Sequence, residues 1–161
     1  MSVLENIFDR AKARAARVVL PEIEDPRIAE AAQQLRAKGL AEPVPLSPVS
    51  DAMVAGLVER RGLKEAIARR MLAKPLFRAA AMVASGAADA MVAGADSPTK
   101  RVIEAASIVI GLRPGVRTPS SFFLMLFPDG RDMIFADCAV NLAPDAGELA
   151  DIARASEHSA E

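Results

Sequence analysis

The sequence predicts a three-layer α/β/α fold with a mostly parallel β-sheet. Short apolar runs that suit buried strands, at residues 17–20, 43–46 and 90–93, alternate with longer segments of helical spacing. This alternation is typical of parallel strands that are joined by helices. Toward the C-terminal end the pattern changes to two apolar runs joined by a tight turn, which predicts a β-hairpin that starts a second lobe.

The N-terminal part of the chain carries clear helix signals. Ser2 and Glu5 form a capping-box pattern ahead of a short helix. The strand at residues 17–20 is followed by a Pro and several acidic residues. We expect Glu22 to finish this strand and Asp25 to cap the next helix, because Pro26 suits a first helical position.

Helical spacing returns between the second and third strands. Residues 53–58 form an apolar face that is interrupted at Arg60-Arg61-Gly62, and residues 63–72 continue the helical pattern. Pro75 then restarts a helix that Gly86 is expected to close. This part therefore predicts consecutive helices before the strand at residues 90–93.

The loop after the third strand is the strongest candidate binding feature in the sequence. The apolar run stops at Gly94 and turns polar and basic just where a helix that reaches Gly111 begins. A helix N-terminus offers unpaired backbone N–H groups and a positive potential, so this loop suits a phosphate or a similar oxyanion. The alternative is a plain helix cap with a solvated first turn. The candidate phosphate-binding residues are Ser97, Thr99, Lys100 and Arg101.

The C-terminal part reads as a hairpin and a final helix. Residues 122–127 and 133–136 are apolar and flank a Pro-Asp-Gly turn. Asp137 and Asn141 follow the second strand in a loop, where polar side chains either bind a ligand or cap the final helix. Asp145 and Glu148 are expected to start that helix.

These patterns predict a division into two lobes. We expect residues 1–115 to form the first α/β lobe, with the phosphate loop, and residues 116–161 to begin the second. Ligands of open α/β sheets bind outside the carboxyl ends of the strands. Glu22, the loop at residues 94–101 and Asp137 all follow strands, so they are expected to converge on one side.

Composition excludes several classes of protein. Hydrophobic residues make up 52% of the chain and the net charge is only -1, which disfavours disorder and nucleic-acid binding. No apolar run is long enough to cross a membrane, and the chain shows no secretory signal, so a cytoplasmic location is expected. With Cys138 as the single cysteine and His158 as the single histidine, neither a disulfide nor a zinc site is expected.

Several blocks of the sequence resemble the phosphate acetyl/butyryltransferases, also called phosphotransacetylases. Their order and approximate spacing match those of the family, and together they cover nearly all of the chain. The resemblance is to the N-terminal half of family members, which are roughly twice as long. The blocks are Val18-Val19-Leu20-Pro21-Glu22, Met91-Val92-Ala93-Gly94-Ala95, Ser120-Ser121-Phe122-Phe123-Leu124-Met125 and Phe135-Ala136-Asp137-Cys138-Ala139-Val140-Asn141.

The resemblance implies an isocitrate/isopropylmalate-dehydrogenase-like fold, here incomplete, with substrates bound between two α/β/α lobes. It implies reversible transfer of an acetyl group between coenzyme A (CoA) and phosphate. CoA is then a substrate, and no further cofactor and no metal is implied. In the family mechanism an aspartate takes the thiol proton of CoA, while arginines and a serine stabilise the phosphate. The family usually works as a homodimer.

The resemblance also suggests further binding residues. A family arginine precedes a glycine and corresponds here to Arg60 or Arg61, which would otherwise lie in an exposed turn. Ser120 and Ser121 are placed at the cleft by the resemblance, whereas they otherwise simply open a strand. Another family arginine corresponds to Glu104, so Arg101, one turn earlier on the helix, is expected to substitute for it.

No residue of the chain corresponds to the family's catalytic serine and aspartate. These belong to a later segment that nothing in residues 1–161 matches, and the connection after the second strand is also shortened. We therefore expect a phosphate acetyltransferase or its N-terminal portion, weak or inactive as an isolated chain. Its expected partners are CoA or acyl-CoA with phosphate or acyl phosphate, and a second copy or a complementing chain.

Two alternatives remain at the level of sequence. One is a non-catalytic acyl-CoA-binding or regulatory module of the same family, which would bind acetyl-CoA without turnover. The other is a truncated remnant with neither activity nor binding, whose unpaired hairpin would expose apolar surface.

Overall fold

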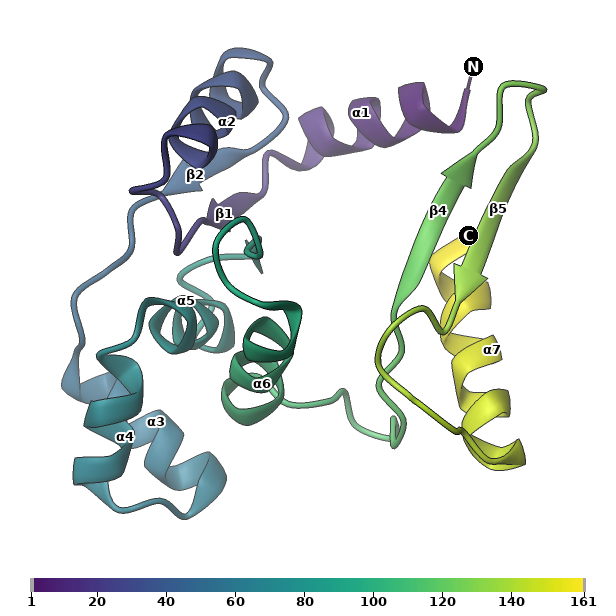
Figure 1. Cartoon of the computed structure of the whole chain (residues 1–161). Coiled ribbons are helices and arrows are strands. Elements are labelled where there is room, and N and C mark those ends of the chain that lie inside the picture. Colours follow the sequence, from purple (N-terminus) through teal and green to yellow (C-terminus); the bar gives the residue numbers. More distant parts are fainter. Residues whose placement is uncertain (1, 161) are drawn as a thin grey trace. The chain divides into compact units, whose positions relative to one another are not determined.

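The computed structural model describes residues 2–160, which divide into two compact units. The first is Met1–Gly111 and the second is Leu112–Glu161. This division lies a few residues before the boundary at 115/116 that was expected from the sequence. Figure 1 shows the order of the elements along the chain.

A parallel three-stranded sheet forms the centre of the first unit. Its strand order is β2 (Glu42–Val44), β1 (Arg17–Val19) and β3 (Ala90–Met91). Both pairings are parallel, with Val19 opposite Val44 on one side and Met91 on the other. The predicted parallel sheet is thus confirmed, with strands that end earlier than the apolar runs suggested.

Helices cover both faces of this sheet. Successive side chains of a strand point to opposite faces. Val18 packs with Ala32 of α2 (Pro26–Ala37), whereas Val19 packs with Ala79 of α5 (Pro75–Ala84). The predicted three layers are therefore present, although the sheet is small.

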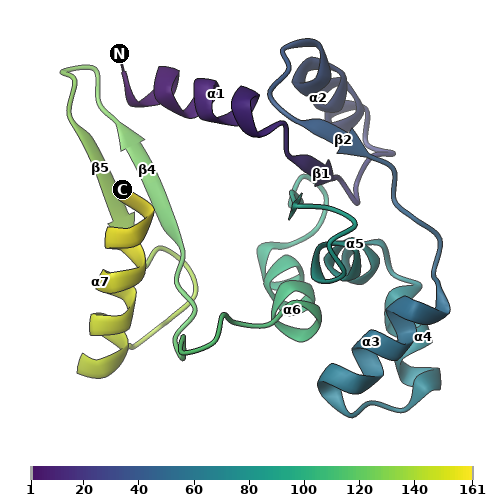
Figure 2. The ribbon, with the colours of Figure 1, turned by 180° about the vertical axis from the view of Figure 1, so that it is seen from behind.

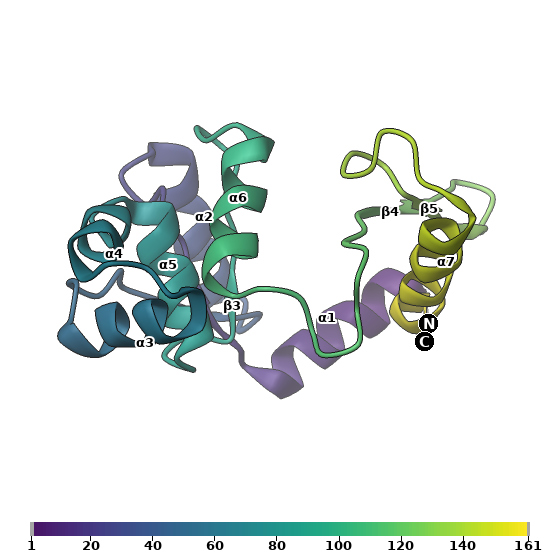
Figure 3. The ribbon, with the colours of Figure 1, turned by 90° about the horizontal axis from the view of Figure 1, so that it is seen from below.

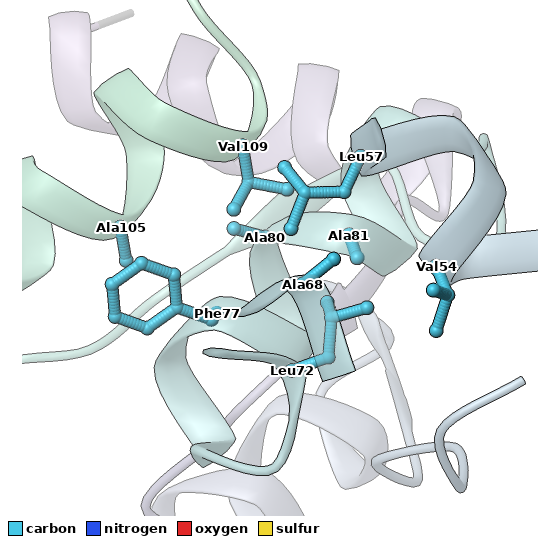
Figure 4. Packing of buried hydrophobic residues seen from close by; sticks show 9 residues of the cluster. All are labelled: Val54, Leu57, Ala68, Leu72, Phe77, Ala80, Ala81, Ala105 and Val109. Carbon is cyan, nitrogen blue, oxygen red and sulfur yellow. The ribbon is translucent and has the colours of Figure 1, made fainter. Parts of the chain in front are cut away.

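The largest hydrophobic core lies among four helices. These are α3 (Asp51–Arg61), α4 (Glu65–Leu72), α5 and α6 (Thr99–Val109). Figure 2 shows this group from behind, and Figure 4 shows the packing of its buried side chains. Leu57, Leu72 and Val109 are fully buried in it. This core holds α5 and α6 together and so fixes the positions of their N-terminal ends.

Several helix ends follow the sequence signals. Ser2 caps α1 (Val3–Arg14) in a complete capping box, Asp25 caps α2, and Ser50 caps α3. By contrast, Lys74 and Pro98, which precede α5 and α6, provide no side-chain cap. Their first N–H groups therefore depend on other partners.

The second unit is a hairpin with one helix. Strands β4 (Phe122–Leu126) and β5 (Asp132–Ala136) pair antiparallel, which confirms the predicted hairpin. Helix α7 (Ala146–Ala160) lies beside β5, as Figure 3 shows. Among the described residues of the whole chain, no helix has the length and hydropathy of a membrane span.

Candidate functional site

A cavity of the first unit lies where β1 and β3 end and where α2, α5 and α6 begin. Its volume is about 800 Å³. This is the position at which open α/β sheets bind their ligands. The lining residues are Pro21, Glu22, Glu24, Asp25, Pro26, Lys74, Pro75, Leu76, Phe77, Asp96, Ser97, Pro98 and Arg101.

The N-terminal ends of α5 and α6 give this cavity groups that suit an anion. Lys74 precedes α5 and Pro98 precedes α6, and neither helix has a side-chain cap. Helix N-termini carry a partial positive charge, which the Lys74 ammonium reinforces. Lys74 Nζ lies 5.7 Å from the centroid of the Phe77 ring, so the ring helps to hold the ammonium in place.

Four backbone N–H groups in the loop before α6 converge on the carboxylate of Glu22. Gly94 N and Ala95 N each lie 2.8 Å from Glu22 Oε2. Asp96 N lies 3.3 Å and Ser97 N 2.7 Å from Glu22 Oε1. The arrangement is a backbone nest of the kind that binds anions, and here a side chain of the same protein fills it.

The nest shifts the acidity of Glu22. Partial burial by itself raises the pKa of Glu22, but hydrogen bonds from Ser97, Ala95 and Gly94 outweigh burial and lower this pKa to about 2. Glu22 is therefore ionised at neutral pH. Sequence reasoning placed Glu22 at the end of the strand and missed this role.

The candidate phosphate-binding residues of this loop differ in their positions. Ser97 and Arg101 line the cavity, whereas Thr99 and Lys100 do not. Arg101 Nη1 lies 2.8 Å from Glu104 Oε2, so a neighbouring carboxylate already compensates its charge. Lys74 is a further cation at the cavity that sequence reasoning did not name. The Lys-Pro pair at the start of a helix was the signal that could have indicated it.

Neither arginine of the Arg60-Arg61 segment lines this cavity. Arg61 lies at the end of α3 and donates hydrogen bonds from Nε and Nη2 to the carbonyl oxygens of Ile108 and Ser107. These carbonyls belong to the last turn of α6, where a cation is favourable. Arg60 is exposed and folds back along its own helix toward Gly56.

In the second unit, three predicted residues form one hydrogen-bonded group. Asp137 Oδ1 accepts from Ser121 N at 2.9 Å and from Ser121 Oγ at 2.7 Å. Asp137 Oδ2 accepts from Asn141 N at 2.6 Å and from Asn141 Nδ2 at 2.9 Å. Ser120 stands apart from this group and donates from Oγ to the Ser121 carbonyl.

The hydrogen bonds of this group also lower the pKa of its carboxyl. Burial alone raises the pKa of Asp137, but hydrogen bonds from Ser121 and Asn141 outweigh it and hold this pKa well below its usual range. Ser121 Oγ additionally accepts from the backbone N–H groups of Cys138 and Ala139. Within residues 2–160 no group of three or more His, Cys, Asp or Glu side chains is placed to hold a metal ion.

Comparison with known proteins assigns the chain to a family. The family model described as phosphate acetyl/butaryl transferase matches residues 2–56 and 47–161. The chain belongs to this family. The two matched stretches overlap next to the connection between β2 and α3, which the sequence indicated to be shortened.

Curated relatives of this family member are named phosphate acetyltransferases. The protein of Paracoccus denitrificans is 38% identical over 182 residues, which cover 99% of this chain and 57% of that protein. The protein of Acetivibrio thermocellus is 30% identical, and the match covers 100% of this chain and 58% of that protein. The chain thus spans little more than half the length of these relatives.

Solved structures show the same partial correspondence. A phosphotransacetylase from Streptococcus pyogenes superposes with a TM-score of 0.83 at 29% identity, over 95% of this chain and 56% of that one. The EutD phosphotransacetylase from Staphylococcus aureus superposes with a TM-score of 0.79 at 28% identity, over 92% of this chain and 55% of that one. These matches confirm the phosphotransacetylase-like α/β fold and the resemblance to the N-terminal half.

Proposed function

We propose that this family member contributes the N-terminal portion of a phosphate acetyltransferase, which interconverts acetyl-CoA and phosphate with acetyl phosphate and CoA. The cavity at the starts of α5 and α6 carries the proposal. Lys74, Ser97 and Arg101 line it beside two uncapped helix N-termini. Such groups suit a phosphate of CoA or of the acyl phosphate.

The proposed reaction requires no covalent bond between the protein and its substrates. An acyl phosphate already has a good leaving group, so the protein must mainly hold the two substrates in line and compensate phosphate charge. Lys74 and Arg101 are proposed to compensate this charge, and Ser97 to donate a hydrogen bond. The proton of the CoA thiol would be taken by a group outside the matched half, where the family's aspartate is expected.

The remaining sequence candidates stay proposals for substrate binding. Thr99 and Lys100 lie on the first turn of α6, and Arg60 is exposed at the end of α3, so all three are accessible to a ligand. Arg61 is engaged in hydrogen bonds within the first unit, and Ser121, Asp137 and Asn141 are engaged in hydrogen bonds within the second. Ser120 also belongs to the second unit and donates to the Ser121 carbonyl. A homodimer or a complementing chain is proposed on the family resemblance, and a cytoplasmic location on the sequence pattern described above.

A second candidate function is acyl-CoA binding without turnover. It is favoured by the sequence pattern, in which no residue of the chain corresponds to the family's catalytic serine and aspartate. In that case the chain would sense or present acyl-CoA, and catalysis would not occur. Binding and turnover therefore have to be measured separately.

The test combines calorimetry with a coupled assay on the purified 161-residue chain. We expect CoA and acetyl-CoA to bind to the wild-type chain. Lys74→Ala should weaken this binding about tenfold, since one charged phosphate contact contributes about 1.5 kcal/mol. Lys12→Ala, on α1, should leave the binding unchanged. Turnover of CoA with acetyl phosphate would establish the enzyme, and binding without turnover would favour the second candidate. Equal effects of the two lysine variants would contradict the assignment of this cavity.

A further inference from the structure

The N–H groups of the loop Gly94–Ser97, here called the amide loop, bind a carboxylate of the same chain, that of Glu22. The sheet register brings the two together, because Val19 of β1 pairs with Met91 of β3. Because the two strands are parallel, the residues three positions after this pair, Glu22 and Gly94, lie side by side. Glu22 then accepts all four N–H groups of the amide loop.

A second clamp acts on the same loop from α2. Arg27 donates to the carbonyl oxygen of Ala95 at 3.1 Å. The Arg27 guanidinium is itself held by Asp25, with Nη2 2.6 Å from Asp25 Oδ2. The N–H groups of the loop and one of its carbonyls are therefore fixed by residues that follow β1.

We propose that the Glu22 carboxylate permanently occupies the anion site formed by the four N–H groups of the amide loop. It thereby holds the loop rigid as one wall of the cavity and prevents free oxyanions from binding to these N–H groups. A carboxylate and a phosphate use the same N–H donors, so only one can occupy them. Glu22 is tethered next to the loop and ionised, which gives it an effective concentration of the order of millimolar or higher. Free phosphate at comparable concentrations does not displace it.

Glu22 thus acts as a positioning residue, and the cavity has two parts. The backbone N–H groups of the amide loop are structural, and a ligand phosphate is left with other donors, on Lys74, Arg101, the Ser97 hydroxyl and the start of α5. Which N–H groups an anion can reach does not depend on acyl transfer, so it can be measured whether or not the chain has any activity.

The direct test is amide hydrogen exchange and chemical-shift mapping by NMR on the ¹⁵N-labelled full chain. Glu22→Gln keeps the shape but turns one acceptor into an NH2 donor that faces two backbone N–H groups. We expect amide hydrogen exchange at residues 94–97 to become at least about tenfold faster, since these N–H groups lose part of their hydrogen bonding to Glu22 and the loop opens more often. Glu24→Gln, in the same cavity and without a hydrogen bond to the loop, should leave these amides unchanged.

A rescue experiment separates a resident anion from a merely structural side chain. Glu22→Ala leaves a space of carboxylate size next to four N–H donors. Formate, acetate or inorganic phosphate should then shift the resonances of residues 94–97 and raise the melting temperature with increasing concentration. The wild-type chain and Glu24→Ala should show neither response at the amide loop.

Two results would overturn the proposal. One is a wild-type chain whose amide-loop resonances shift with inorganic phosphate as strongly as those of Glu22→Ala. The other is a folded Glu22→Gln variant whose loop amides exchange as slowly as in the wild type. If Glu22→Ala fails to fold, the exchange measurement on Glu22→Gln alone decides.

Discussion

Arg61 illustrates, at the scale of one residue, how a basic side chain in a candidate segment is used inside the fold. Its guanidinium joins the end of α3 to the last carbonyls of α6. The contact is close enough that a Cβ on Gly111 would lie 3.0 Å from Arg61 Nη2. Arg60, one residue earlier, makes no such contact with α6 among the hydrogen bonds of the described residues.

We therefore expect Arg61→Ala and Arg60→Ala to differ in stability. Loss of the charged hydrogen bonds at the α6 terminus should lower the free energy of unfolding by about 1 kcal/mol, a value reduced by solvent exposure. Arg60→Ala should change it by less than about 0.5 kcal/mol, as is usual for an exposed side chain. Urea unfolding of the two variants measures the difference. Equal destabilisation would show that Arg61 does not act as a helix-end cation.

At the scale of elements, the connection between β5 and α7 is organised by Asp137. Its carboxylate accepts from Ser121 ahead of β4 and from Val140 and Asn141 after β5. One side chain thus ties the entry of the hairpin to its exit. Because these bonds favour the ionised form, they hold the pKa of Asp137 well below the usual range of an aspartate.

Asp137→Asn should loosen this connection. An amide group places an NH2 where Oδ2 or Oδ1 now accepts, so backbone hydrogen exchange at Ser121, Val140 and Asn141 should become faster. Asp132→Asn, at the first residue of β5, is the matched control, because the Asp132 side chain accepts no hydrogen bond within residues 2–160. The stabilisation by Asp137 should be complete above pH 3.8 and be lost as the pH falls below it, since the folded-state pKa is lowered. Unchanged exchange in Asp137→Asn would contradict this role.

Local signals accounted for most elements but not for their long-range contacts. The caps at Ser2 and Asp25 and the hairpin turn depend on neighbouring residues, so the sequence pattern was sufficient to predict them. Glu22 reaches N–H groups more than 70 residues away. Such a contact depends on strand register, which no local pattern contains. The sequence therefore predicted a loop that suits an anion, but not that the Glu22 carboxylate accepts its N–H groups.

At the scale of the whole molecule, apolar surface is left uncovered on two elements. On the hairpin, Phe123 is 62% exposed and Phe135 is 48% exposed. On α1, Leu4, Ile7 and Phe8 form an exposed apolar stripe. Contiguous exposed apolar residues of this kind mark contact surfaces. A two-stranded hairpin is also only marginally stable by itself, so the second unit is expected to gain stability from a covering partner.

The hairpin surface leads to a prediction about association. We expect the 161-residue chain to self-associate or to bind a hydrophobic dye, and to lose this property when a partner covers the hairpin. Phe123→Ser should weaken self-association by about tenfold or more, because burying one Phe side chain contributes about 1.5–3 kcal/mol. Light scattering over a concentration series measures this change.

Leu142→Ser provides the control for this surface. Leu142 is fully exposed but lies in the loop between β5 and α7, outside both strands. A single exposed apolar residue contributes little to association, so this variant should behave as the wild type.

The segment of the Paracoccus denitrificans protein that lies beyond the matched 57% is the natural partner to add. If it covers the hairpin, dye binding should fall on mixing in the wild type and fall less in Phe123→Ser. A wild-type chain that stays monomeric and binds no dye at any concentration would show that the hairpin does not act as a contact surface.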